Sequence, residues 1–520
     1  MADTAPRGVR IAVEGCGHGT LNAIYAAVER SCKERGWDTV DAVIIGGDFQ
    51  AVRNAADLSV MSVPPKYREL ADFPEYYAGT RTAPYLTLFI AGNHEAAAHL
   101  WELYYGGWVA PNIYYLGAAN VLRLGPLRIA GMSGIWKGFD YRKAHHERLP
   151  FSQDDVKSFY HVREIDVRKL LQVRTQVDVG LSHDWPRGIE RHGNRRHLFN
   201  MKPDFERESN DGTLGNPAAE YVMDRLRPPY WFSAHLHCKF TAIKTYDDAP
   251  PETATEQPAA PEPPAAAPVT NTTTNPDEID LDMDDDEDEG EKPPPTKTEP
   301  APETETDETE ALRAQLPASF AKPTTTPTTV PKTTPGQPVP PSISNKTVRF
   351  LALDKCLPGR KFLQLLEIPI PTTSSSSPPP PPSPYKLSYD PEWLAITRVF
   401  SSLTTTIGDR NITHPPPDEG EAHYRPLIEA EERWVDEHIV KTKKLAVPEN
   451  FVQTAPPHVP GQHPELTDEQ PDEYTNPQTV AFCELVGVPN LWDASEEERR
   501  ERREKGPPPA VGYDGSRGGR

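Results

Sequence analysis

Five short stretches of the chain place Cys, His, Asp or Asn directly after an apolar run. They are Cys16-Gly17-His18, Gly47-Asp48, Gly92-Asn93-His94-Glu95, Ser182-His183-Asp184 and Ala234-His235-Leu236-His237. Side chains of these types bind divalent cations, and their number suffices for two ions that share one carboxylate. The sequence therefore predicts a two-metal centre assembled from segments that lie far apart in the chain.

Two metal ions are suited to the hydrolysis of a phosphodiester. Roughly 3.5–4 Å apart, such ions acidify a water between them and clamp the phosphate oxygens. The donors divide into two sets, Cys16, His18 and His237 for one ion and Asn93, His183 and His235 for the other. Asp48 would bridge the two ions. His94 follows the Asn ligand and can point past the metals, so it is a candidate acid that protonates the leaving oxygen.

Cys16 bears on the identity of the metals. A thiolate is softer than a carboxylate and favours zinc or ferrous iron over manganese or magnesium. We expect two divalent ions, Fe(II), Zn(II) or one of each, with Mn(II) as the alternative. In the alternative arrangement, Cys16 lies too far from the ion to bind it, and this pocket then holds its metal weakly.

The apolar runs before the motifs are typical of buried strands. They are Val9–Glu14, Ala42–Gly46, Tyr85–Ala91, Val177–Leu181 and Tyr230–Ser233. Helix-like segments alternate with them, which indicates an α/β fold. Loops at the carboxyl ends of parallel strands meet at one edge of a sheet, so this placement brings the donors together.

Two more elements are predicted around these strands. Thr20 is expected to cap a helix that runs through about Gly36, with an apolar face at helical spacing. Residues Asn120–Ile129 are expected to form a hairpin that turns at Gly125-Pro126.

The composition is uneven along the chain. Its 520 residues include 59 prolines and only 36% hydrophobic residues, which indicates much material that cannot form a core. Residues 248–310 hold 21 acidic side chains against two lysines, a local balance of −19 out of a total of −22. The rest of the chain has a net charge of only −3, which does not exclude a nucleic-acid substrate. Five cysteines without CxxC pairs favour a reducing compartment, and no segment is suited to a membrane.

These shifts divide the chain into four predicted parts. Residues 8–247 form the α/β domain, and residues 248–345, rich in Pro, Thr and acid, are a predicted disordered linker. Order is expected to resume in an α+β region over 346–490, with a low-complexity insert at 372–384. Residues 491–520 are predicted to be a disordered tail.

The motifs resemble a known superfamily. The series D-x-H, G-D, G-N-H-E/D, H and G-H-x-H is the pattern of the calcineurin-like metallophosphoesterases, with Cys16 here in place of Asp and Ala234 in place of Gly. The Cys variant, in VEGCGHG, is similar to the RNA lariat debranching enzymes, as are GGDFQAVRN (46–54) and FLALDKCLPGRKFLQ (350–364). The resemblance covers about 8–247 and much of 347–490. It implies an α/β/β/α metallophosphoesterase sandwich, followed by a C-terminal α+β region.

The resemblance also implies a function. Members would hydrolyse the 2′-5′ phosphodiester at the branch point of excised intron lariat RNA, in the nucleus, beside splicing-associated proteins. A lariat-recognition loop would fall near residues 129–160, where aromatic and basic side chains alternate. Rings there would stack on unpaired bases while cations meet phosphates. The candidates are Trp136, Lys137, Phe139, Tyr141 and Arg142.

Two other functions fit the same residues. A general or cyclic-nucleotide phosphodiesterase could use this scaffold, and it would cleave linear and branched RNA alike. A non-catalytic splicing-associated scaffold could keep the fold without metals. A binding module, however, has no physical need for the complete donor set.

Overall fold

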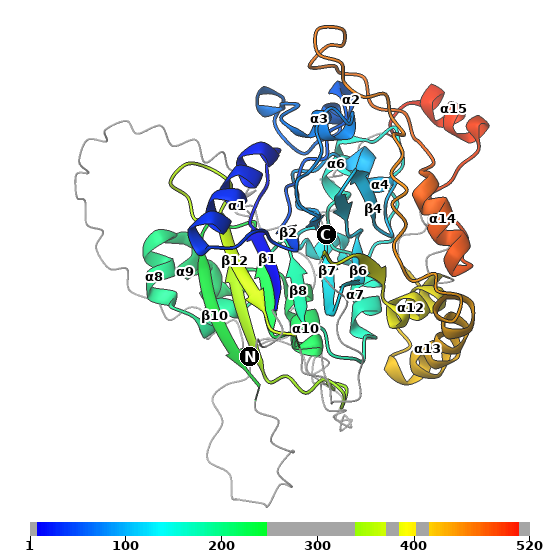
Figure 1. The fold of residues 1–520 in the computed structure, drawn as a ribbon. Helices are drawn as coiled ribbons and strands as arrows, with labels where there is room; N and C mark the ends of the chain where they lie inside the picture. Colours follow the sequence, from blue (N-terminus) through cyan, green and yellow to red (C-terminus); the bar gives the residue numbers. More distant parts are fainter. Residues whose placement is uncertain (1–7, 247–337, 371–383, 402–414, 509–520) are drawn as a thin grey trace, which may run out of the picture. The chain divides into compact units, whose positions relative to one another are not determined.

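The structure is a computed structural model that describes residues 8–246, 338–370, 384–401 and 415–508. Two β-sheets form its centre (Figure 1). In order, the first sheet contains β12 (Leu363–Ile368), β1 (Val9–Glu14), β2 (Ala42–Ile45), β3 (Thr87–Phe89), β5 (Ile113–Tyr115) and β4 (Gly107–Ala110). The second contains β10 (Phe240–Thr245), β11 (Thr347–Ala352), β9 (Tyr230–Ser233), β8 (Val179–Ser182), β7 (Leu127–Met132), β6 (Ala119–Leu124) and β13 (Leu387–Tyr389).

Helices connect and cover these strands. Those of the first 246 residues are α1 (Leu21–Arg35), α2 (Ala55–Ser59), α3 (Phe73–Tyr77), α4 (Ala97–Trp101), α5 (Gly138–Tyr141), α6 (Gln153–Ser158), α7 (Glu164–Leu171), α8 (Arg195–Met201), α9 (Asp204–Asp211) and α10 (Pro217–Leu226). Later helices are α12 (Pro391–Ser401), α13 (Glu421–Val435), α14 (Pro477–Val486) and α15 (Glu496–Lys505). A π-turn over Asp436–Val440 extends α13, and single 3₁₀ turns lie at Pro65–Tyr67 and Ile189–His192.

The side chains of β1 alternate between two hydrophobic cores. Ile11 and Val13 belong to the core that also holds Leu181 of β8 and Trp231 of β9, so the two sheets pack face to face. Ala12 points to the other side, into the core that contains the apolar face of α1. Helices α7 and α10 lie against each other, and α7 also contacts β6 and β7 of the second sheet. The α/β/β/α sandwich implied by the resemblance is confirmed.

The predicted helix and hairpin are both present, but the predicted cap of the helix is not. Helix α1 ends at Gly36, which adopts the left-handed conformation at φ 67°. Thr20 precedes the helix, yet its side chain caps no helical amide, so that part of the prediction is wrong. The Thr20 hydroxyl instead donates to the Gly17 carbonyl at 2.8 Å, which fixes the loop before the helix. Strands β6 and β7 pair antiparallel, as predicted for the hairpin.

The C-terminal region completes both sheets. Strand β12 pairs antiparallel with β1, and β11 lies between β10 and β9 in the second sheet. Strand β13 pairs with β6 at the far edge. The predicted region 346–490 therefore shares its sheets and its core with residues 8–246.

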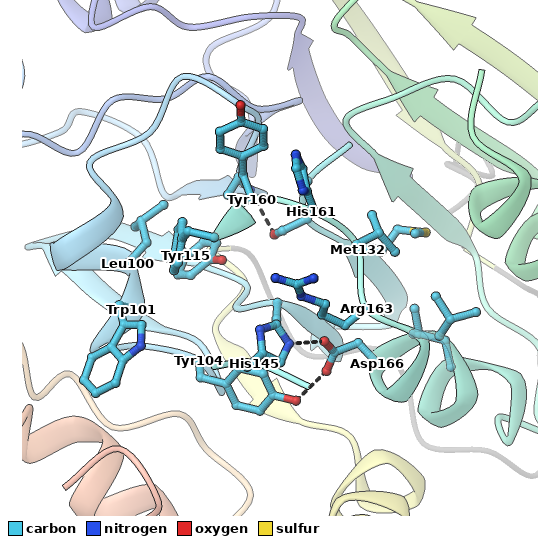
Figure 2. Close-up of a pocket in the computed structure, with 18 of the residues that line it drawn as sticks. Leu100, Trp101, Tyr104, Tyr115, Met132, His145, Tyr160, His161, Arg163 and Asp166 are labelled. Atoms are coloured by element: carbon cyan, nitrogen blue, oxygen red, sulfur yellow. Dashed lines mark hydrogen bonds and ion pairs between the residues drawn. The ribbon is translucent and has the colours of Figure 1, made fainter. Parts of the chain in front are cut away.

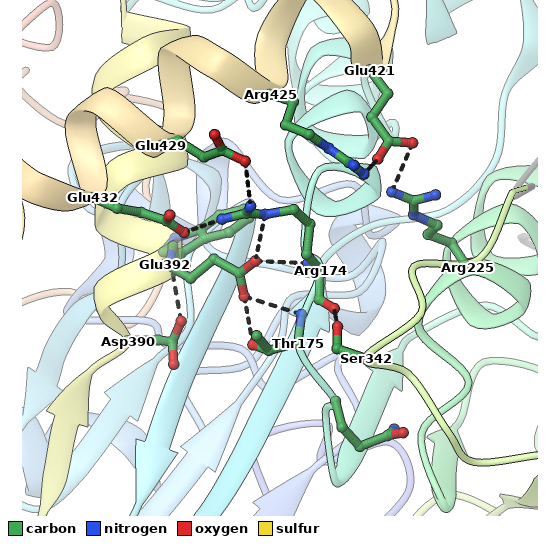
Figure 3. A network of polar contacts seen from close by, with 12 residues as sticks. Arg174, Thr175, Arg225, Ser342, Asp390, Glu392, Glu421, Arg425, Glu429 and Glu432 are labelled. Atoms are coloured by element: carbon green, nitrogen blue, oxygen red, sulfur yellow. Dashed lines mark hydrogen bonds and ion pairs between the residues drawn. The ribbon is translucent and has the colours of Figure 1, made fainter.

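A polar network joins α12 and α13 to Arg174 and Thr175, which precede β8 of the second sheet (Figure 3). The Glu392 carboxylate of α12 accepts hydrogen bonds from the Arg174 amide at 2.7 Å and the Thr175 hydroxyl at 2.6 Å. The Arg174 guanidinium in turn pairs with Glu429 and Glu432 of α13. Glu392 itself is buried, so removal of one of its partners would be costly.

Two predicted boundaries need correction. The predicted linker ends too late, because Ile343 is buried and the Asn345 side chain donates to the Arg227 carbonyl at 2.8 Å. The predicted tail begins too early, because Trp492 is 3% exposed and stacks on Tyr104 with ring centroids 4.0 Å apart. The rest of the linker, nearly all of the insert and residues 509–520 lie outside the described residues.

Within the described ranges, none of the helices combines the length and the hydropathy needed to cross a bilayer.

Candidate metal centre

All five motifs lie where a strand ends. Cys16 and His18 follow β1, Asp48 follows β2, and the Asn93-His94 pair follows β3 in the first sheet. His183 follows β8, and the His235–His237 segment follows β9 in the second sheet. The carboxyl ends of these parallel strands meet, so both sheets contribute to one site, as expected from the sequence.

The first predicted donor set is a compact cluster. The metal-binding atoms of Cys16, His18, Asp48 and His237 all lie within 4.8 Å of one another. The Nε2 atoms of His18 and His237 are 3.5 Å apart, and His18 Nε2 lies 3.7 Å from Asp48 Oδ2. Cys16 Sγ accepts a hydrogen bond from the His235 amide at 3.2 Å. Two imidazoles, a thiol and a carboxylate at these separations can enclose one divalent cation.

The second predicted set meets the other side of Asp48. Asp48 Oδ1 lies 3.5 Å from His183 Nε2, and the rings of His183 and His235 are 5.0 Å apart. The His183 Nδ1–H donates to the Gly46 carbonyl at 2.8 Å, which directs Nε2 toward Asp48. Asn93 is 3% exposed. Each oxygen of Asp48 thus faces a different donor set.

The site contains buried polar atoms that a cation would satisfy. In the described part of the chain, Asp48 Oδ2 and His183 Nε2 are buried without a hydrogen-bond partner. Buried polar atoms of native proteins are normally satisfied, so a pair of such atoms at one place calls for a ligand. The donor set therefore fits divalent metal ions.

The electrostatics of the site favour the same conclusion. Burial lowers the pKa of His18 to about 4, of His235 to about 3 and of His237 to about 2, so these imidazoles are neutral and able to bind a metal. Burial alone would raise the pKa of Asp48, but the facing histidines outweigh it and hold that pKa well below its usual range. Burial, and then the charge of Asp48, raises the pKa of the Cys16 thiol. A cation at this position would favour the thiolate.

Several donors have a backbone conformation that is rare outside glycine. His18, Asp48, His235 and His237 have φ values of 40°, 47°, 62° and 46°. Each such residue costs on the order of 1–3 kcal/mol, and such strain gathers at functional sites. Glycines make room beside them: a Cβ on Gly92 would lie 2.1 Å from Asp48 Oδ1, and one on Gly47 would lie 2.1 Å from His183 Nδ1.

One residue of the third motif has a role that the sequence did not reveal. The buried Glu95 carboxylate accepts hydrogen bonds from the amides of Phe49, Gln50 and Gly92 at 2.8–2.9 Å. Burial, and then the charge of Asp48, raises the pKa of Glu95 to about 8 against the effect of these amides. Glu95 therefore ties the loop after β2 to the loop after β3.

The comparisons agree with this site. A family model for calcineurin-like phosphoesterase matches residues 9–239, and one for the C-terminal domain of lariat debranching enzyme matches residues 345–491. Proteins named lariat debranching enzyme from Schizosaccharomyces pombe, Arabidopsis thaliana and Homo sapiens are 38%, 34% and 37% identical to this chain. The alignments cover 96%, 94% and 92% of this chain and 98%, 88% and 69% of those relatives. The chain belongs to the lariat debranching enzyme family. It is thus a hydrolytic phosphodiesterase, and the metallophosphoesterase fold implies divalent metal ions.

The loop predicted for lariat recognition follows β7, and its candidates divide by exposure. Trp136 and Tyr141 are partly buried against the core, with ring centroids 4.7 Å apart. Phe139 is 65% exposed, Arg142 is exposed and Lys137 is half-buried. In this lariat debranching enzyme family member, the exposed members of the loop are therefore the ones free to contact a substrate.

Part of the loop lines a cavity of about 50 Å³, with His145, Phe159 and Tyr160 among the lining residues (Figure 2). Asp166 accepts hydrogen bonds there from the Tyr104 hydroxyl and from His145 Nε2, the latter at 2.7 Å. The lining includes Trp492 but none of the predicted metal ligands. The cavity is therefore distinct from the metal centre.

Proposed function

We propose that this enzyme hydrolyses the 2′-5′ phosphodiester at the branch point of excised intron lariat RNA. Family membership supports this substrate, because the relatives are named for debranching. The observation that carries the chemistry is the position of Asp48, whose oxygens face His18 on one side and His183 on the other. One carboxylate between two donor sets is what a pair of bridged cations requires.

The residues have distinct proposed roles. Cys16, His18 and His237 would hold one ion, Asn93, His183 and His235 the second, and Asp48 both. When bound, two such ions supply a nucleophile at neutral pH and neutralise the charge of the phosphate. His94 is half-buried at the edge of the site, with its ring 5.7 Å from that of His18, and would give its proton to the leaving oxygen.

The test of substrate class compares two RNAs of the same sequence, one with a 2′-5′ branch and one linear with 3′-5′ linkages only. We expect hydrolysis of the branch linkage and none of the linear chain. Equal rates on both would contradict the proposal and favour a general phosphodiesterase. Absence of cleavage in protein that holds two metal ions would favour a non-catalytic scaffold.

We also propose Fe(II), Zn(II) or one of each as the native metals, rather than Mn(II). The proposal rests on Cys16 Sγ, which lies within the first donor cluster. Metal analysis of protein purified anaerobically from its native source tests it, with Cys16→Asp as the matched variant. We expect iron or zinc in the native protein and a shift toward manganese in the variant. Manganese alone in the native protein would contradict the proposal.

The RNA partner and the nuclear location are proposed together, since intron lariats arise where splicing occurs. Phe139 is proposed to stack on an unpaired base, which is worth about 1–3 kcal/mol. Phe139→Ala should therefore raise KM for branched RNA roughly tenfold with kcat retained. A fluorescent fusion should accumulate in nuclei, and exclusion from them would contradict the location.

A further inference from the structure

The turn between β11 and β12 brings the C-terminal half of the chain against the metal centre. Cys16 and Lys355 form an isolated parallel bridge. In it, the Cys16 amide donates to the Asp354 carbonyl and the Cys356 amide donates to the Cys16 carbonyl, each at 3.4 Å. This approach requires a glycine before Cys16, because a Cβ on Gly15 would lie 2.2 Å from the Asp354 carbonyl oxygen. Lys355 is thus fixed beside a predicted metal ligand, and paired residues direct their side chains to the same face.

The position of the Lys355 ammonium group is not explained by an ion pair with any described residue. Lys355 is half-buried, and among the described residues no carboxylate lies within ion-pair distance of its ammonium group. Its neighbour Asp354 pairs instead with Arg360 at 3.6 Å. Burial is the main cause of the low pKa of His18 and of His237, and the charge of Lys355 adds to it at both. A half-buried cation at this position would attract an anion that approaches the metal centre.

A second lysine lies near the second donor set. Lys137, in the predicted recognition loop, is also half-buried and has no ion pair with any residue that the structure describes. Its charge acts on His235 and on Asp184, next to the second donor set. Each donor set therefore has one half-buried lysine whose charge reaches it.

We propose that Lys355 is a substrate-binding residue that holds a backbone phosphate of the RNA next to the scissile bond. This inference rests on the proposed function and gives the C-terminal half of the chain a direct part in binding RNA. The rest of the turn is accessible to an RNA strand, because Leu357 and the Arg360 side chain are 43% and 42% exposed. Cations at such positions neutralise phosphates irrespective of base sequence.

The test compares Lys355→Ala with Lys361→Ala on a synthetic 2′-5′ branched RNA. Both variants remove one positive charge from the same turn, but Lys361 is exposed and its charge acts on Lys239 rather than on the histidines. For Lys355→Ala we expect KM to rise about tenfold with kcat within about twofold. The slope of log(kcat/KM) against log salt should decrease by about 0.7. Lys355→Arg should restore most of the loss, and Lys361→Ala should match the wild type.

Other results overturn the inference. Unchanged KM and salt slope in Lys355→Ala, or an equal loss in Lys361→Ala, would show that Lys355 has no special contact with RNA. Loss of bound metal or a lower Tm in Lys355→Ala would make the lysine structural. Failure of the proposed function is distinguishable, because the wild type would then show no preference for branched RNA.

Discussion

The backbone amide of His94 donates a hydrogen bond to Asp48 Oδ1 at 2.9 Å. The residue proposed as the acid is thus tied, through its main chain, to the carboxylate between the two donor sets. Its side chain remains separate from that bond. The two roles of this residue, positioning Asp48 and delivering a proton, can therefore be tested independently.

Replacement of the His94 side chain should abolish turnover and spare the metals. In His94→Ala the amide bond to Asp48 is retained, so metal content should match the wild type. Loss of a positioned acid should lower kcat about 10²–10⁴-fold. The measurements are single-turnover cleavage of branched RNA and metal analysis, with the exposed His438→Ala as control. Wild-type turnover in His94→Ala would place the acid elsewhere.

A methyl group on Gly92 should instead remove the metals. In Gly92→Ala the added Cβ would lie 2.1 Å from Asp48 Oδ1 and 2.6 Å from His183 Cε1, so Asp48 must move. We expect loss of bound metal and, with it, of activity. The matched variant is Gly138→Ala, whose Cβ would meet nothing closer than 3.8 Å and which should keep its metal. Full metal content in Gly92→Ala would argue against Asp48 as a bridge.

Acid should destabilise the fold through His99. Burial, and then the charge of Arg53, lowers the pKa of His99 to about 3, from about 6.5 in the unfolded chain. The unfolded chain therefore binds one more proton between these values, so stability is complete above pH 6.5 and falls as the pH drops. The contribution should reach about 2 kcal/mol at pH 5. Urea unfolding of wild type and His99→Gln at pH 7.5 and 5 measures it. Parallel pH profiles for the two proteins would exclude His99 as the cause.

Removal of Trp492 should weaken the whole fold. Its buried ring stacks on Tyr104 beside the small cavity, so Trp492→Ala would enlarge that cavity. The expected loss is about 3–5 kcal/mol of unfolding free energy. Arg503→Ala, at a side chain 63% exposed, should change it by less than about 0.5 kcal/mol. If denaturant midpoints show no difference between the two variants, Trp492 is not part of the core.

Local pattern predicted most of the strands and the grouping of the motifs. Runs such as Ala42–Ile45 are apolar on both faces, which identifies buried strands whose ends carry the donors. Pattern alone could not show that β12 pairs with β1, or that two sheets stack, because such contacts join residues distant in sequence. Those features were predicted only to the extent that the resemblance implied them.

The finer geometry of the site was not predictable. The left-handed conformations of Asp48 and His237 are uncommon for these residue types, and no local signal marks them. Glu95 was part of a recognised motif, but two of its three amide contacts come from a loop more than 40 residues away. Lys355 was only one residue of a segment that resembled the family until the bridge to Cys16 placed it.

The pairing of β1 with β12 has a consequence for biosynthesis. A chain emerging from the ribosome would expose one bare edge of β1 until Leu363–Ile368 had been translated. Unpaired strand edges promote aggregation, so we expect the nascent protein to bind a chaperone during that interval. Pairing of the Cys16 strand therefore begins only after Leu363–Ile368 has emerged, and a stop codon anywhere before Leu363 would prevent it.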